Sequence, residues 1–361
     1  MHFTTNRDHL SAALRKCAEV AHKQTMPILG TALLRIKGDT LHISATDLDM
    51  GIQCLVKVEA AREGAVCLPA THLLACVLAC PNLEVKMEVG GDLSAILKSG
   101  SAKFKLYGID AKEFPPTEKI IGTSFSLPES ELVTMLRRVS YAMSDDKNRV
   151  SLNGVYFEFK DGEFCVVATN ARQLSKAKAK AKAKAEDGNF ILPAKTVMVL
   201  QKFLGGDKEV TLTFSDRAVS FECAAGTIQS KILEGSYPNY RQVIPKETKH
   251  RVKIERELMA ECVQRGGLAI GDEKDISVRF AFTKHVLTIS SQSPERGDAS
   301  ADMAIVYDGP EINIALDKTF VLPMLANLTE NEIEIGLKDE LSPFVTTVPD
   351  FISVIMPLRL N

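Results

Sequence analysis

The chain contains no tryptophan, no cysteine pair of the CxxC type and no apolar run of about 18 residues. Its eight cysteines are scattered in apolar surroundings, which indicates buried thiols in a reducing compartment and neither a disulfide framework nor a zinc site. Cys76 and Cys80 stand four residues apart on an expected helix, but no second pair accompanies them. The polar first residues hold no apolar signal segment. We therefore expect a cytoplasmic protein without a membrane span.

The sequence also lacks the motifs of the common enzyme classes. It contains no GxSxG, HExxH, Walker A or GxGxxG pattern, and its seven histidines are dispersed. Gly90-Gly91-Asp92 and Gly205-Gly206-Asp207 resemble motifs, but a hairpin turn and a helix stop explain them. We expect no catalytic residue, no metal and no cofactor. A Cys/His site without a recognised signature stays open as the alternative.

What the sequence does contain is a unit of about 120 residues that is written three times. Each copy opens with a strand pattern and an amphipathic helix, and a second strand–helix pair follows. The openings of that second pair are similar in Leu68–Leu74, Leu192–Met198 and Ile314–Phe320. A repeat spreads like groups evenly, so it favours a stacked or ring-like architecture over a catalytic pocket.

Proline clusters separate the copies and predict three α+β domains, each with two helices against an antiparallel sheet. We place the domains at residues 1–122, 123–247 and 248–361. Within the first domain, Asp8 is the expected helix cap, and Lys37-Gly38-Asp39 is the expected turn of a hairpin. Strands that continue pairing across a domain boundary would make one long sheet with all helices on one face.

A run of alternating lysine and alanine occupies residues 176–185. As a strand it places every lysine on one face and every alanine on the other, although both residue types also favour helices. We favour a solvated sheet edge, where lysine blocks unwanted pairing. A contact for an anionic partner stays open.

The net charge of −2 does not indicate a nucleic-acid binder, but one face can be basic on a neutral chain. Acidic residues are concentrated in strands and loops, such as Glu84 and Glu334, whereas expected helices and their flanks carry basic ones. Helix surfaces need charge in any case, but a bias repeated across the copies favours a positive helical face that contacts phosphates. The basic residues that we assign to this face are Arg137, Arg138, Lys147, Arg149, Lys195, Lys202 and Arg265.

Six motifs in register resemble the bacterial β sliding clamp, the processivity subunit of the replicative DNA polymerase III. They begin at Met26, Ala45, Leu152, Ala168, Tyr237 and Met356, and they read MPILG, ATDLD, LNG, ATN, YPNYR with VIP, and MPLRL. The resemblance implies three clamp domains per chain and a head-to-tail homodimer that closes into a ring. It also implies a non-catalytic role, in which the ring is loaded around duplex DNA by a clamp loader and tethers the polymerase III alpha subunit and other clamp-binding-motif proteins.

The resemblance further implies an apolar pocket for partner peptides between the second and third domains. Carried over by position, the pocket residues are Leu152, Thr169, Ala171, Arg172, Gln173, Leu174, Pro238, Gln242, Val243, Val354, Met356, Pro357, Leu358 and Arg359. The family usually reads Thr-Asp-Gly-His-Arg-Leu where this chain has Thr169 to Leu174 with Asn, Ala, Arg and Gln between them. This departure predicts an altered order of peptide preference, as in a divergent lineage or a specialised second clamp.

By the same resemblance, Lys23 lies on a DNA-facing loop, and ring closure pairs an edge strand of the first domain with one of the third. Phe104 and Leu106 would meet Ala269 and Ile270 there. Alanine replaces a bulkier residue, so we expect a ring that is held less firmly. The alternative function is a clamp-like peptide-binding hub that takes no part in bulk replication.

Overall fold

The computed structural model describes residues 1–21, 26–180, 187–270 and 277–359. The described chain forms two compact units, one of residues 1–133 and 198–232 and the other of residues 134–180, 187–197 and 233–359. Strands and helices alternate as the repeat predicts, and every strand pairing within the sheets is antiparallel. The predicted α+β class is therefore confirmed. None of the described helices has the length and apolar content that crossing a membrane requires.

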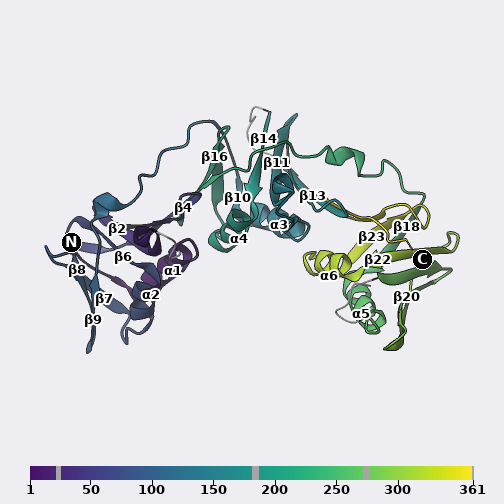
Figure 1. Cartoon of the computed structure of the whole chain (residues 1–361), viewed down its shortest axis with the longest axis horizontal. Coiled ribbons are helices and arrows are strands. Elements are labelled where there is room, and N and C mark those ends of the chain that lie inside the picture. Colours follow the sequence, from purple (N-terminus) through teal and green to yellow (C-terminus); the bar gives the residue numbers. More distant parts are fainter. Residues whose placement is uncertain (22–25, 181–186, 271–276, 360–361) are drawn as a thin grey trace. The chain divides into compact units, whose positions relative to one another are not determined.

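The first unit contains two sheets. The smaller has the order β5-β1-β7-β8-β9, and the larger has the order β10-β15-β16-β17-β4-β3-β2-β6. Their strands are β1 His2–Asn6, β2 Thr31–Lys37, β3 Thr40–Thr46, β4 Met50–Lys57, β5 Glu59–Arg62, β6 Gly64–Pro69, β7 Glu84–Val89, β8 Ser94–Ser99, β9 Ala102–Tyr107, β10 Thr123–Pro128, β15 Glu209–Phe214, β16 Ala218–Cys223 and β17 Gly226–Lys231. Helices α1 Arg7–Ala18 and α2 Ala70–Leu78 lie side by side (Figure 1).

The second unit also contains two sheets, of orders β14-β11-β12-β13-β25-β24-β23-β18 and β21-β20-β19-β22. Their strands are β11 Gly154–Lys160, β12 Glu163–Thr169, β13 Gln173–Lys180, β14 Gly188–Pro193, β18 His250–Glu255, β19 Ser277–Thr283, β20 Val286–Ser293, β21 Gly297–Ala304, β22 Ile312–Asp317, β23 Glu332–Leu337, β24 Phe344–Val348 and β25 Phe351–Ile355. The remaining helices are α3 Glu129–Ser140, α4 Ala194–Phe203, α5 Arg256–Gly266 and α6 Lys318–Ala326.

Each eight-stranded sheet joins strands from two copies of the repeat. β4 pairs with β17 in the first unit, and β13 pairs with β25 in the second. The expectation of strand pairing across copies is thus confirmed, but it produces two eight-stranded sheets and not one continuous sheet.

The first helix shows how sequence produces these elements, and it corrects one prediction. Its cap is Asn6 and not Asp8, because the Asn6 side chain accepts hydrogen bonds from the backbone N–H groups of Asp8 and His9. Asp8 lies in the first turn, where its negative charge interacts favourably with the positive end of the helix dipole. Leu10 and Leu14 recur at helical spacing and are fully buried against the sheet.

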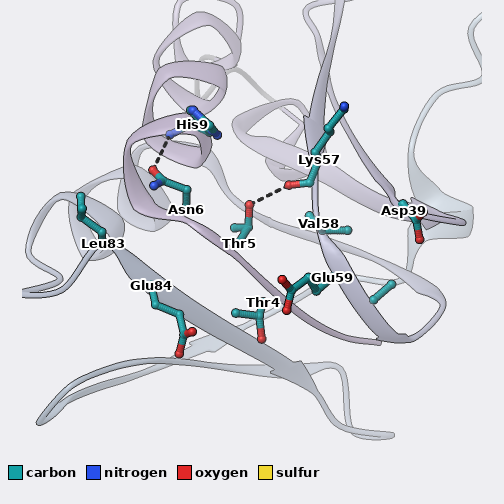
Figure 2. Close-up of a pocket in the computed structure, with 11 residues that line it drawn as sticks. Thr4, Thr5, Asn6, His9, Asp39, Lys57, Val58, Glu59, Leu83 and Glu84 are labelled. Carbon is teal, nitrogen blue, oxygen red and sulfur yellow. Dashed lines mark hydrogen bonds between the residues drawn. The ribbon is translucent and has the colours of Figure 1, made fainter.

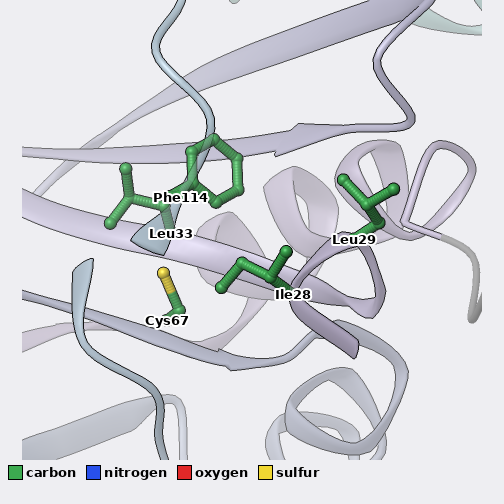
Figure 3. Packing of buried hydrophobic residues seen from close by; sticks show 5 residues of the cluster. All are labelled: Ile28, Leu29, Leu33, Cys67 and Phe114. Carbon is green, nitrogen blue, oxygen red and sulfur yellow. The ribbon is translucent and has the colours of Figure 1, made fainter. Parts of the chain in front are cut away.

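A small cluster fixes the segment that leaves the first repeat. Phe114 packs with Ile28, Leu29, Leu33 and Cys67, which come from β2, β6 and the turn before β2 (Figure 3). Burial raises the pKa of the Cys67 thiol to about 11. The cluster therefore holds the proline-rich segment after Phe114 against the sheet.

The described part of the Lys-Ala run forms a strand, which was one of the two conformations expected for it. Ala177 and Ala179 are buried, while Lys178 is exposed and pairs with Glu163 at 3.1 Å. The favoured edge position is wrong for this part, because β13 lies between β12 and β25. The residues from 181 onward lie outside the described chain.

Candidate functional site

An apolar pocket of about 180 Å³ lies in the second unit, where β13 pairs with β25. Most of the predicted pocket residues line it, namely Leu152, Thr169, Ala171, Arg172, Gln173, Leu174, Pro238, Val243, Val354 and Met356. Its lining also includes Asn239 and Tyr240, which the sequence analysis did not assign to it. An aromatic residue in a proline-bounded linker was the signal available for Tyr240.

Four predicted pocket residues are absent from this lining. They are Gln242, Pro357, Leu358 and Arg359. Leu358 instead donates its backbone N–H to the carbonyl oxygen of Ala315 at 2.8 Å, which holds the C-terminal segment against β22. Gln242 and Arg359 are exposed. Their role in peptide binding stays a prediction.

A tight turn between β12 and β13 forms one wall of the pocket. The Thr169 hydroxyl donates to the carbonyl oxygen of Gln173 at 2.6 Å. Asn170 Oδ1 accepts from the backbone N–H groups of Arg172 and Gln173 at 3.0 and 2.9 Å. Ala171 has φ 73°, a left-handed conformation that favours glycine. Asn170 thus supplies the turn acceptor without a charge, since its side-chain oxygen accepts as a carboxylate would.

The floor of the pocket is formed by Leu174, Tyr240 and Val354, which pack in a buried cluster with Val167, each 3% exposed or less. Leu174 and Val354 are direct partners across the β13–β25 pairing, so their side chains share one face. This floor is apolar and already ordered, which suits an apolar anchor of a bound peptide.

Glu158 fixes the aromatic wall of the pocket. Its carboxylate accepts from the Tyr240 hydroxyl at 2.6 Å and from the Arg241 guanidinium at 3.1 and 2.6 Å. Burial, followed by the hydrogen bond to Glu158, raises the pKa of Tyr240 well above its usual value. Tyr240 therefore remains a hydrogen-bond donor at neutral pH. Tyr237 stacks on Tyr156 with 4.6 Å between ring centroids and supports the same segment.

Arg172 covers the neighbouring surface. Its guanidinium carbon lies 4.8 Å from the ring centroid of Phe320 in α6, and its carbonyl oxygen accepts the backbone N–H of Met356 at 2.9 Å. The side chain that departs from the family pattern thus packs on an aromatic ring beside the pocket.

The residues predicted to contact DNA fall into distinct environments. Lys23 lies outside the described residues. Arg149, Lys202 and Arg265 are exposed but pair with Asp146 at 3.5 Å, Glu19 at 3.0 Å and Glu261 at 2.6 Å. Lys195 is exposed on α4.

Arg137 and Lys147 are also exposed, and neither has an ion pair among the residues that the structure describes. Surface ion pairs are weak, so all of these cations are open to exchange with phosphates.

Arg138 differs from its neighbour Arg137. Its guanidinium forms an ion pair with Glu330, donates to the carbonyl oxygen of Pro349 at 3.2 Å and lies 5.9 Å from the ring centroid of Phe351. Only 12% of its side chain is exposed. These contacts join α3 to the third repeat within the second unit and give Arg138 a structural role.

The predicted ring-closing residues are only partly on strands. Phe104 and Leu106 lie on β9, an edge strand, although Leu106 is buried. Ala269 and Ile270 lie on no strand, which corrects the expectation that they belong to the edge strand of the third repeat. They follow α5 and are buried, whereas the edge strands of the sheet there are β21 and β22.

No group of three or more His, Cys, Asp or Glu residues able to hold a metal occurs in the described ranges. A wider cavity of about 790 Å³ in the first unit lies between β1, the β4–β5 segment and β7 (Figure 2). Thr5 and Asn6 use their side chains there to bind the Lys57 carbonyl oxygen and the His9 backbone N–H. This cavity is open and polar, and it holds none of the predicted site residues.

Comparison with known proteins gives one consistent family. Models of the DNA polymerase III beta subunit match residues 1–118 with the N-terminal domain, 126–239 with the central domain and 241–359 with the C-terminal domain. The three matches confirm the predicted three-domain architecture, while the residue boundaries that we assigned stay predictions.

Two relatives and one solved structure illustrate the similarity. The beta sliding clamp of Chlamydia pneumoniae is 29% identical and that of Escherichia coli is 26% identical, each over 100% of both chains. The structure of a sliding clamp from Pseudomonas aeruginosa bound to griselimycin is 27% identical, covers 100% of both chains and has a TM-score of 0.94.

Proposed function

The chain belongs to the DNA polymerase III beta subunit family, the sliding clamps, and from this premise we propose that it encircles duplex DNA as a closed ring. The family is a non-catalytic processivity factor. Two chains close head to tail in the cytoplasm, and a clamp loader places the ring on DNA. The ring then tethers the polymerase III alpha subunit and other proteins that carry a clamp-binding peptide.

The apolar pocket floor of Leu174, Tyr240 and Val354 is the observation that carries the proposal. A leucine or phenylalanine anchor that it buries contributes roughly 1.5–3 kcal/mol. Asn170 and Glu158 hold the surrounding turn and linker in place, so little ordering is required on binding. Such a site suits short linear peptides of many different partners.

Exposed cations support the DNA-binding half of the proposal. Arg137, Lys147 and Lys195 lie on or beside helices and are exposed. Nonspecific phosphate contacts exchange continuously, so a ring held by its topology slides without reading bases. Retention then does not depend on a large net positive charge.

Primer extension on primed circular DNA, with loader and polymerase, tests the proposal. The wild-type chain is expected to lengthen the products. Val243→Asp places a charge in the pocket wall at a 43% exposed position, and it is expected to abolish that gain and to weaken binding of a Leu-Phe peptide at least about tenfold.

Val306→Asp, at an 82% exposed position outside the pocket, is the matched control and is expected to behave as wild type. Unchanged product length with the wild-type chain would contradict the proposal. If peptide binding persisted in that case, the chain would be a peptide-binding hub.

A further inference from the structure

The backbone arrangement around the peptide pocket of the second unit occurs again in the first unit. There the Thr46 hydroxyl donates to the carbonyl oxygen of Met50 at 2.9 Å, as Thr169 does to Gln173. The backbone N–H of Met50 donates to Asp47 Oδ1 at 2.7 Å. Leu48 has φ 77°, close to the 73° of Ala171. The two turns therefore match bond for bond.

The strand that faces the turn is placed in the same way in both units. β17 pairs with β4 as β25 pairs with β13. The backbone N–H of Lys231 donates to the Asp49 carbonyl oxygen at 2.8 Å, and that of Met356 donates to the Arg172 carbonyl oxygen at 2.9 Å.

In each unit a linker forms the remaining wall of the cavity beside the turn, which we call the groove of that unit. Pro115–Ile121 line a cavity of about 420 Å³ in the first unit, and Pro238–Tyr240 line the smaller one in the second. Phe114 anchors the first linker in its apolar cluster (Figure 3). Tyr237 anchors the second on Tyr156.

The side chains of the two grooves differ in chemistry at corresponding positions. The strand registers place Gly51 where the peptide pocket has Leu174, and Gln229 where it has Val354. Lys231 stands in the place of Met356 and forms an ion pair with Asp49 at 3.0 Å.

Thr117 follows the anchoring residue Phe114 by three positions, as Tyr240 follows Tyr237. Thr117 therefore corresponds to Tyr240 of the pocket. The first groove therefore lacks apolar side chains at these four positions, although Leu48, Met50, Ile120 and Ile121 also line its cavity. An apolar anchor placed over the four positions would desolvate Gln229 and the Lys231–Asp49 ion pair.

We infer that Gly51, Thr117, Gln229 and Lys231 determine peptide selection by excluding apolar anchors from the first groove. Each chain thus binds one peptide with an apolar anchor, in the second unit, although both units contain a groove of this geometry. The inference rests on the proposed function of the pocket in the second unit.

The test converts the first groove to the chemistry of the second. The variant Gly51→Leu, Thr117→Tyr, Gln229→Val and Lys231→Met changes only exposed or partly exposed positions. A Cβ at Gly51 meets nothing closer than 3.9 Å, so the first carbon of a side chain has room there. Isothermal titration with a synthetic peptide that ends in Leu-Phe measures the number of peptides bound per chain.

The wild type is expected to bind one peptide per chain, and the quadruple variant two, with affinities within about tenfold of each other. Leu174→Gly with Tyr240→Thr, added to the quadruple variant, is expected to return the number to one. Circular dichroism confirms that each variant is folded. The double variant Gly51→Leu, Gln229→Val replaces the quadruple one should that fail to fold.

Two peptides per wild-type chain would overturn the inference, as would one peptide per chain in the folded variant. A wild type that binds no peptide would contradict the proposed function and not this inference. In that case, one peptide per chain in the folded quadruple variant would support the inference, and none would overturn it.

Discussion

Two residues in left-handed backbone conformations mark the corresponding turns of the two units. Ala171 and Leu48 both have a positive φ that costs a side-chain-bearing residue about 1–2 kcal/mol. The hydroxyl and carboxyl or amide groups of Thr46, Asp47, Thr169 and Asn170 hold the turns in this conformation. The ATDLD and ATN motifs that carry the resemblance lie at these turns, but neither the turns nor the sign of φ was predicted, because the hydrogen bonds that enforce them form only in the folded chain.

Replacing Ala171 with glycine is expected to raise the free energy of unfolding by about 1 kcal/mol, because the strain is relieved. Urea unfolding followed by circular dichroism measures the change. Ala12→Gly, at an exposed position inside α1, is the control and is expected to lower stability by about 1 kcal/mol. Equal destabilisation by both substitutions would contradict the conformation assigned to Ala171.

Arg137 and Arg138 are neighbours with opposite roles. Arg138→Ala removes the partner of a largely buried Glu330 and is expected to lower the free energy of unfolding by about 3 kcal/mol. Arg137→Ala, at an exposed position, is expected to change stability by less than about 0.5 kcal/mol and to weaken retention on DNA. Denaturant titration and a DNA-retention assay on each variant check the pair. Equal effects in both assays would refute this division.

The sequence placed both arginines on one helix but could not separate them. Its period of 3.6 residues locates a face, whereas the contacts of Arg138 come from residues far along the chain, at Glu330 and Phe351. The pocket shows the same limit at Tyr240, which lines it but was not assigned to it. Tyr240 was missed because its burial depends on Glu158, a partner in a distant strand.

Strands and helices themselves were largely predictable. Apolar and polar residues alternate in Glu84–Val89 and Glu209–Phe214, which form β7 and β15, because one face of each strand is buried. The interior position of β13 was not predictable, since no local pattern indicates that β25 pairs with it. Sheet order depends on pairings between distant segments, which a single sequence does not display.

The Lys-Ala strand gives a test at the scale of an element. Ala177→Lys places a charge at a position only 1% exposed and is expected to lower the free energy of unfolding by at least about 3 kcal/mol. Lys178→Ala removes an exposed lysine that pairs with Glu163, and it is expected to cost less than about 1 kcal/mol. Chemical denaturation compares the two variants. Similar effects would show that the segment does not alternate as a strand.

At the scale of the whole molecule, the proposed ring closure depends on association between two chains. β9 and β21 are edge strands of their sheets, each with one side left unpaired within the described chain. Because Ala269 is small and is buried beside α5, we expect a weakly held dimer. Sedimentation velocity over a dilution series is expected to show dissociation toward nanomolar concentration. A dimer that persists there would contradict this expectation.

Retention on circular compared with linear DNA most directly tests the proposal that topology holds the chain on DNA. A loader places labelled protein on nicked circular DNA, the salt is raised to about 0.5 M to remove electrostatic binding, and the DNA is then cut once. We predict that the protein stays on the circle through the salt step and leaves when the circle is cut. Loss at the salt step, or equal retention before and after cutting, would contradict the account.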